Sequence, residues 1–160
     1  MGKRIESRSD VQKEIERYII EKVSVKLGGI NMVSNPRLVL GNDDRLFICP
    51  DFFSENGRII GEIHTHEGRL KSAQQDKIAS DVLKMILHDK MTGITFRKYI
   101  AVCGKEEYEQ LKGASYLAEA IRQYEINLLF VEIPEDKRNR LREAVMKQDL
   151  RVSQSEDIHV

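Results

Sequence analysis

The chain has 160 residues, and its 26 Lys and Arg balance 26 Asp and Glu, so the formal net charge is zero. This length predicts one domain with its own core, and the charge balance excludes an overall field that would draw it to nucleic acid or anionic membrane. No apolar run approaches the roughly 18 residues of a membrane span, so we expect no membrane partner. The start lacks a signal peptide and the two cysteines favour free thiols, as in a cytoplasmic protein.

The first part of the chain alternates helical and extended patterns. Ser9 and Gln12 fit a capping box for a helix over about 11–27, which Gly28-Gly29 would end. A short strand near 37–40 and a turn over 41–44 come next. Residues 45–53 and 58–66 then predict a β-hairpin, because Asn56-Gly57 tolerates the positive φ of a tight primed turn.

Helices and apolar strands alternate in the rest of the chain. The predicted elements are a helix over 72–90, a strand over 98–104, a helix over 106–124 broken around Gly113, a strand over 127–133 and a helix over 135–148. This order predicts an α/β fold with a mixed central sheet and helices on both faces. We expect a single domain over 1–150 and a mobile tail over 151–160.

The predicted hairpin brings two acidic residues together. A two-residue loop at Asn56-Gly57 places Asp51 directly opposite Glu62, and a register shifted by two residues still leaves them diagonal on one face. Side chains alternate along a strand, so His64 and His66 point to that face too. Opposed carboxylates among apolar residues need a proton, a partner or a metal, and the sequence therefore predicts a cation between Asp51 and Glu62.

This pattern resembles the PD-(D/E)xK superfamily, the restriction-endonuclease-like nucleases, over about residues 10–133. The resemblance rests on Pro50-Asp51 and Glu62-x-His64, which fall on the second and third predicted strands. It implies an αβββαβ core: a helix, a three-stranded antiparallel meander, a helix and a parallel strand. It also implies Mg²⁺ or Mn²⁺ held by Asp51, Glu62 and the backbone carbonyl of Ile63, with Glu14 on the first helix as a further ligand.

Residues 61–84 are more narrowly similar to a bacterial branch of that superfamily with no assigned function. The matching positions are Glu62, His66, Gly68, Leu70, Lys71, Gln75, Lys77, Asp81 and Lys84. The family lysine should stand at position 64, where this chain has histidine. The resemblance implies that His64 or His66, with Lys71 or Lys77, activates water and steadies the phosphate, while Gln75 orients substrate or solvent.

The predicted function is therefore metal-dependent hydrolysis of phosphodiesters in DNA or RNA. Basic residues next to the site would track phosphates, although interleaved acidic residues also fit an ordinary salt-bridged surface. These basic residues are Arg69, Lys71, Lys77 and Lys84. The competing hypothesis is a catalytically degenerate member that serves as a binding module for nucleic acid or protein. The oligomeric state stays open, a homodimer included.

Two further alternatives use the same histidines. His64 could pair with Asp51 or Glu62 in a purely structural role. His64-Thr65-His66 followed by Ser72 and Asp76 also resembles the JAMM metalloproteases, in which two histidines and an aspartate hold Zn²⁺. Against this, the spacing from His66 to Asp76 is one residue short of that motif.

Overall fold

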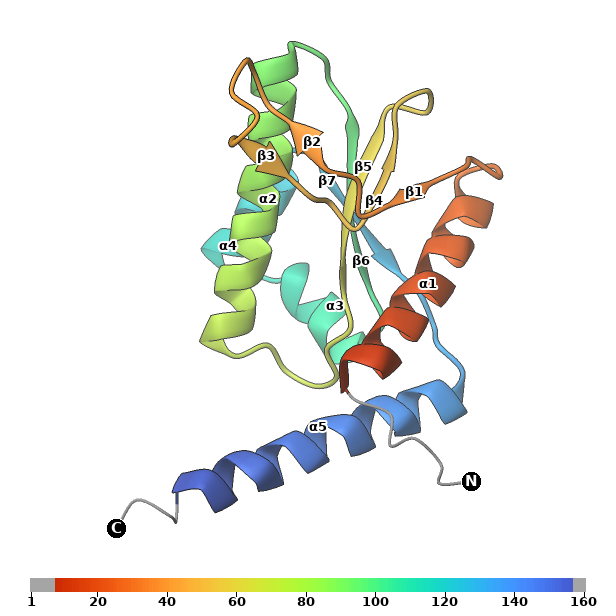
Figure 1. The fold of residues 1–160 in the computed structure, drawn as a ribbon, viewed down its shortest axis with the longest axis vertical. Helices are drawn as coiled ribbons and strands as arrows, with labels where there is room; N and C mark the ends of the chain where they lie inside the picture. Colours follow the sequence, from red (N-terminus) through yellow and green to blue (C-terminus); the bar gives the residue numbers. More distant parts are fainter. Residues whose placement is uncertain (1–7, 157–160) are drawn as a thin grey trace.

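The computed structural model describes residues 8–156 (Figure 1), beginning with helix α1 (Arg8–Lys26). Ser9 and Gln12 lie inside α1, so the predicted capping box is wrong; Gln12 instead donates a hydrogen bond to Glu16 one turn later. Gly28 and Gly29 adopt φ of 92° and 78° and end the helix as predicted, since residues with a side chain rarely adopt such angles.

A mixed five-stranded sheet forms the centre of the molecule, which confirms the predicted α/β class. Across the sheet the strands are β1 (Val33–Ser34), β4 (Phe52–Ser54), β5 (Ile59–His64), β6 (Arg97–Val102) and β7 (Ile126–Phe130). The first three strands pair antiparallel, and β6 and β7 continue the sheet parallel to β5.

The predicted strand over 45–53 is two separate elements. Its first part is β3 (Phe47–Ile48), which pairs with β2 (Leu38–Val39) in a two-stranded ribbon beside the sheet. Its second part is β4, and the chain bends at Asp51 between them. The continuous apolar pattern over 45–53 predicted one strand, and it did not indicate that the first part of this segment pairs outside the main sheet.

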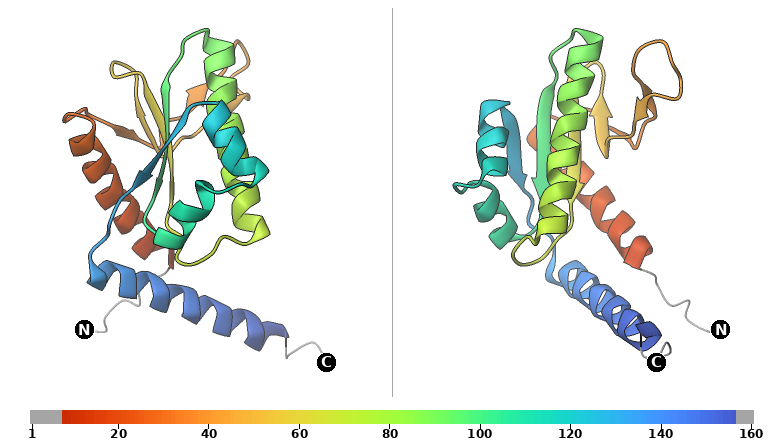
Figure 2. Two further views of the ribbon diagram at one scale, coloured as in Figure 1. Left: turned by 180° about the vertical axis from the view of Figure 1, so that it is seen from behind. Right: turned by 90° about the vertical axis from the view of Figure 1, so that its left-hand side faces the viewer.

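Helices cover both faces of the sheet (Figure 2). They are α2 (Ser72–Thr92), α3 (Lys105–Leu111), α4 (Tyr116–Gln123) and α5 (Glu135–Glu156). The α2, α3 and α4 side chains share one apolar core with Ile60 and Ile100, whereas α1 and the start of α5 share another with Ile59 and Ile63. This split follows from the alternation of side chains along β5.

The helix break around Gly113 is confirmed by the separation of α3 from α4. Helix α5 continues to Glu156, beyond its predicted end at 148, and 157–160 lie outside the described residues. In the part of the chain that the structure describes, no helix is both long and apolar enough to cross a membrane.

The hairpin register is as predicted, but the turn is not. Phe52 lies opposite Gly61 and Ser54 opposite Ile59, so one further step places Asp51 opposite Glu62. The loop contains four residues, and Arg58, not Asn56 or Gly57, adopts positive φ at 51°. Ser54 Oγ accepts a hydrogen bond from the Gly57 amide at 3.0 Å, which stabilises this wider loop over the expected primed turn.

Gly61 allows the hairpin to pack around a buried ring. A Cβ atom at Gly61 would lie 2.0 Å from Phe52 Cζ, and the Phe52 side chain is fully buried. The ring therefore occupies the space that a side chain at position 61 would need.

We expect Gly61→Ala to lower the free energy of unfolding by about 1–3 kcal/mol because it overpacks this contact. Urea denaturation measures the change. The double variant Gly61→Ala, Phe52→Leu should lose less than the sum of the two single variants, because the clashing ring atoms are gone. Strict additivity would contradict the contact.

Candidate functional site

The two predicted carboxylates meet at the bend before β4. Asp51 Oδ2 accepts a hydrogen bond from the Ile63 amide at 2.7 Å, which fixes its carboxylate across the hairpin from Glu62. Glu62 lies in the middle of β5 and is 4 % exposed. Its Oε1 atom is buried and has no hydrogen-bond partner among the described residues.

Burial and neighbouring charge both keep Glu62 protonated. Burial raises the pKa of its carboxyl most, the charges of Asp51 and Asp81 and a hydrogen bond with Asp51 raise it further, and the pKa reaches about 9. The carboxyl of Glu107 on α3 is a useful comparison, because burial alone raises its pKa to about 8. Glu62 therefore differs from an ordinary buried carboxyl by its acidic neighbours.

A second buried group lies beside this pair, on the side of β5 that faces α2. His64 Nε2 donates to Asp81 Oδ2 at 3.1 Å, and Lys84 Nζ donates to Asp81 Oδ1 at 2.7 Å. Burial alone would raise the pKa of Asp81, but these hydrogen bonds lower it below its usual range. The structural alternative for His64 thus has Asp81 as partner, instead of Asp51 or Glu62.

Lys84 on α2 is the lysine that lies next to the acidic residues of the site. Burial opposes its charged form, yet the hydrogen bond to Asp81 and the negative charge of Asp81 raise its pKa above the usual value, and the charge of Asp51 adds to this. The resemblance of residues 61–84 to the nuclease branch includes Asp81 and Lys84, and the sequence predicted only that Lys84 is one of the basic residues that would track phosphates. Their spacing of three residues on one helix was the available signal, because it puts both side chains on one face.

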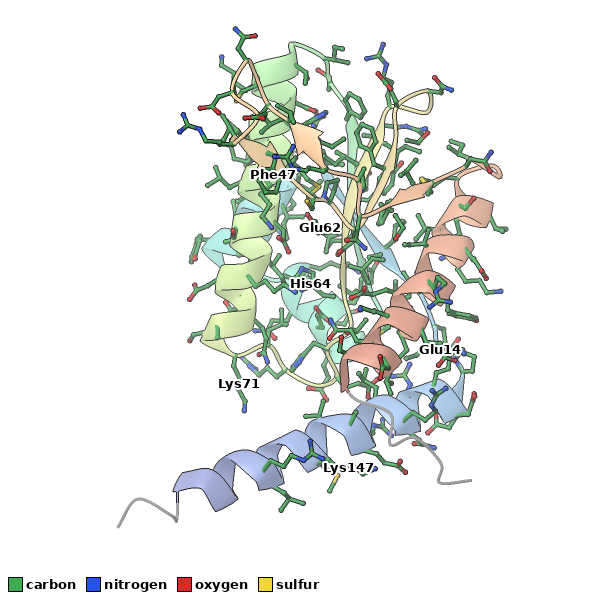
Figure 3. The ribbon with its side chains drawn as sticks, viewed as in Figure 1. Glu14, Phe47, Glu62, His64, Lys71 and Lys147 are labelled. Atoms are coloured by element: carbon green, nitrogen blue, oxygen red, sulfur yellow. The ribbon has the colours of Figure 1, made fainter. Side chains whose placement is uncertain are left out.

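Four of the predicted site residues line a cavity of about 430 Å³ at the end of β5. They are His64, His66, Lys71 and Lys77, and Gln74 and Arg142 contribute to the same cavity. His66 Nε2 donates to the carbonyl oxygen of Arg69 at 3.2 Å. Figure 3 shows His64 beside Glu62, with Lys71 immediately before the start of α2. Within the described chain, Lys71 and Lys77 form no ion pair.

Glu14 lies away from the candidate site, which corrects its prediction as a ligand. Its carboxylate pairs with Arg140 at 2.7 Å and Lys137 at 3.0 Å, and these hydrogen bonds lower its pKa to about 2. Glu16 is the acidic residue of α1 nearer the site: burial raises its pKa, and the charge of Asp51 adds to this. Residues two apart face different sides of a helix, so α1 turns Glu14 towards α5.

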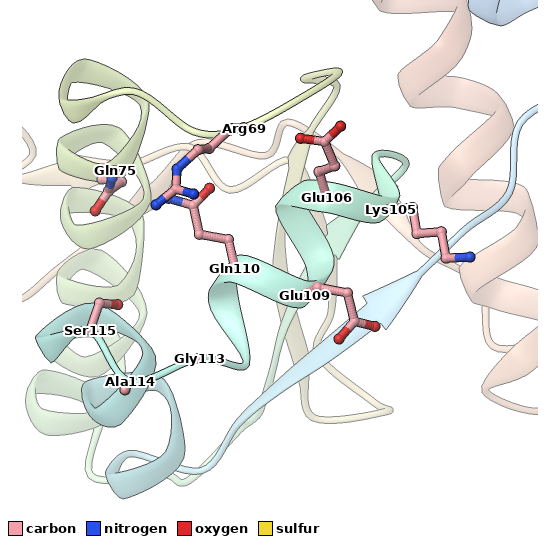
Figure 4. A pocket seen from close by; sticks show the side chains of 9 residues that line it. All are labelled: Arg69, Gln75, Lys105, Glu106, Glu109, Gln110, Gly113, Ala114 and Ser115. Carbon is pink, nitrogen blue, oxygen red and sulfur yellow. The ribbon is translucent and has the colours of Figure 1, made fainter.

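Gln75 also lies elsewhere. Its Nε2 donates to the carbonyl oxygen of Leu70 at 3.3 Å, and its side chain lines a separate cavity of about 890 Å³ with Arg69 and Gln110, between α2 and α3 (Figure 4). The neighbouring Gln74 lines the cavity that contains His64. The glutamine predicted to orient substrate is therefore on the wrong face of α2.

The acidic pair fits a hard divalent cation better than zinc. Among residues 8–156 no group of three or more His, Cys, Asp or Glu is placed to hold a metal, neither at His64, His66 and Asp76 nor around Asp51 and Glu62. Asp51, Glu62 and the Ile63 carbonyl supply only oxygens, and Glu62 Oε1 is unpartnered. Mg²⁺ and Mn²⁺ accept such a small oxygen set because they retain several waters.

We expect Glu62→Gln to be more stable than the wild type at alkaline pH in metal-free buffer. The unfolded chain releases the Glu62 proton near pH 4.5 but the folded chain only near pH 9, so wild-type stability falls as pH rises between them. Relative to wild type, the variant should gain about 4 kcal/mol between pH 5 and pH 8, because one proton accounts for about 1.4 kcal/mol per pH unit inside this window. Urea denaturation at both pH values checks this, with exposed Glu55→Gln as control; a pH-independent difference would contradict it.

Comparisons of the chain with known proteins found no match. No family model, no curated protein and no solved structure matches it. The basis for a function is therefore the geometry of one partly buried cluster, which contains Asp51, Glu62, His64, Asp81 and Lys84.

Proposed function

We propose that the protein is a metal-dependent phosphodiesterase that hydrolyses DNA or RNA. Asp51, Glu62 and the Ile63 carbonyl would hold Mg²⁺ or Mn²⁺. The observation that carries the proposal is the buried, unpartnered Glu62 Oε1 directly beside a second carboxyl. Two apposed carboxyls destabilise a fold unless a proton or a cation compensates them, and such a pair is a candidate functional site.

The order of elements supports the same proposal. Helix α1, the antiparallel strands β1, β4 and β5, helix α2 and the parallel strand β6 follow the αβββαβ order of restriction-endonuclease-like nucleases. Asp51 precedes the second strand of that meander and Glu62 lies on the third. We assign the role of the missing family lysine to Lys84, which reaches the carboxylates from α2 in place of a residue at position 64.

The network around Asp81 suits this chemistry. A bound divalent ion would polarise a phosphate oxygen and lower the pKa of an attacking water. Lys84 would stabilise negative charge on the phosphate. Asp81 Oδ2 accepts a hydrogen bond from the protonated Nε2 of His64, which leaves Nδ1 as the imidazole nitrogen able to accept a proton from water.

The cavity next to His64 supports a polyanionic substrate. Lys71 and Lys77 line it and form no ion pair within the described residues, although the charge of Lys77 also acts on the Glu16 carboxyl. Both positive charges therefore face a cavity into which a phosphate would fit. Neutralisation of phosphates by lysine side chains provides much of the affinity of proteins for nucleic acids. A local cluster of lysines provides it even in a chain with zero net charge.

A catalytically degenerate binding module is the second candidate. The observation in its favour is that Asp81 accepts hydrogen bonds from both His64 and Lys84. Such a satisfied buried network also stabilises a fold without any catalytic role. Metal binding separates the two candidates.

Mg²⁺ or Mn²⁺ should raise the melting temperature of the metal-stripped protein, because a ligand that binds only the folded state stabilises it by about 2.7 kcal/mol at 100 times its Kd. The shift should vanish in Asp51→Asn and Glu62→Gln. Glu107→Gln is the matched control: it removes another buried carboxyl, with its pKa of about 8, and should keep the full shift. If neither ion changes the melting temperature of the wild type, the nuclease proposal is wrong and the binding module is the better candidate.

In cleavage assays on labelled single-stranded and duplex DNA and RNA, we expect Lys84→Met to reduce the Mn²⁺-dependent rate at least about 100-fold. Exposed Lys90 lies on the same helix, so Lys90→Met controls for the loss of one positive charge and should cleave normally. If the two variants cleave at equal rates, Lys84 has no catalytic role.

A further inference from the structure

A cavity of about 720 Å³ lies between the β2–β3 ribbon, the hairpin loop and the end of α2. It shares no lining residue with the cavity at His64, and its volume is that of a small-molecule site. Its principal lining residues are Arg37, Leu38, Phe53, Arg58, His88 and Phe96. The right-hand view of Figure 2 shows the ribbon standing apart from the sheet beside α2.

An aromatic cluster forms the wall of this cavity. Phe53 and Phe96 stack with ring centroids 5.4 Å apart, and His88 contacts the Phe96 ring edge-on at 4.8 Å. All three side chains are buried, and His88 is only 4 % exposed. A wall of this kind favours a planar, largely apolar ligand.

The nearest partner of His88 Nδ1 is the Asp89 carboxylate, which lies beyond ordinary hydrogen-bond distance. His88 Nδ1 is buried without a hydrogen-bond partner among the described residues, and Asp89 Oδ1 is 3.7 Å away. That carboxylate is already engaged, since it accepts hydrogen bonds from the Phe96 amide and from Lys98 Nζ. Burial lowers the pKa of His88, so the ring is neutral and offers one donor and one acceptor, as the edge of a nucleobase does.

The rim of the cavity is positive. Arg37 and Arg58 are exposed, and neither forms an ion pair with a carboxylate in the described part of the chain. The Arg37 guanidinium donates a hydrogen bond to the Asp44 carbonyl and lies 4.1 Å from the Phe47 ring centroid, so a phosphate would have to compete for it. Glu55 is the single acidic residue in the lining. The Arg58 guanidinium lies 5.7 Å from the Phe96 ring centroid, which directs it over the aromatic wall. The Arg58 carbonyl accepts a hydrogen bond from the Arg97 amide at 2.7 Å, and this fixes the unusual backbone conformation at Arg58.

We propose that this cavity binds a nucleoside monophosphate. The base packs against Phe53, Phe96 and Leu38 and hydrogen-bonds to His88. The phosphate lies between the two rim arginines, whose guanidinium groups form strong charge-assisted hydrogen bonds with phosphate oxygens. A neutral aromatic interior with a cationic rim selects a ligand that is uncharged at one end and anionic at the other. This inference is independent of the carboxylate site.

Isothermal titration calorimetry of the full chain in metal-free buffer tests it with AMP, GMP, CMP and UMP. At least one nucleotide should bind about tenfold more tightly than inorganic phosphate and than its own nucleoside. Arg37→Ala and Arg58→Ala should each weaken that binding about tenfold. Arg45→Ala is the matched control, because Arg45 lies on the same ribbon outside the cavity and pairs with Asp43 at 2.8 Å.

His88→Phe keeps an aromatic ring while removing the hydrogen bond, so it should abolish the preference for nucleotide over phosphate. If that variant does not fold, the two arginine variants still decide the outcome. The proposal is overturned if no nucleotide binds at millimolar concentration, if phosphate alone binds as tightly, or if both arginine variants bind like wild type. Loss of binding in Asp51→Asn would also overturn it, because the nucleotide would then occupy the carboxylate site.

Discussion

The arrangement of the candidate site depends on one carboxyl group that is buried beside another. Glu62 lies in a strand that is buried throughout, and Asp51 reaches the same point from across the hairpin. Burying the Glu62 carboxyl beside the partly exposed Asp51 carboxylate carries a large free-energy cost unless a proton or a cation compensates it. Lys84 of helix α2 provides a positive charge next to these carboxyls, and its hydrogen bond to Asp81 fixes it there. Helix α2 covers the face of β5 on which Glu62 lies.

Helix α5 holds the surroundings of the site together through two shared carboxylates. Glu67, in the loop after β5, pairs with Arg138 and Arg142, and Glu14 of α1 pairs with two further basic residues of α5. These contacts connect α5 to α1 and to the loop that leads into α2. Arg142 also lines the cavity at His64, so α5 contributes one wall of that cavity.

Much of the site was predictable because it depends on hairpin register. Alternation along β5 places Glu62 and His64 on one face, and the register that places Asp51 opposite Glu62 holds although the turn itself is a wider loop. Helix faces were predicted less well. Gln75 and Glu14 point away from the site, whereas their neighbours Gln74 and Glu16 point closer to it, because a shift of one or two residues changes the face of a helix.

The sequence by itself determined the alternation of helices and strands, the α/β class and the apposition of Asp51 and Glu62. These follow from local periodicity and from pairing between strands that are adjacent in the chain. Only the tertiary structure decided that Asp81 joins His64 to Lys84, that the β2–β3 ribbon covers a cavity at His88, and that Glu14 belongs to α5. Those contacts depend on how α2, the ribbon and α5 pack against the sheet, and packing geometry is not encoded in the spacing of residues along a single element.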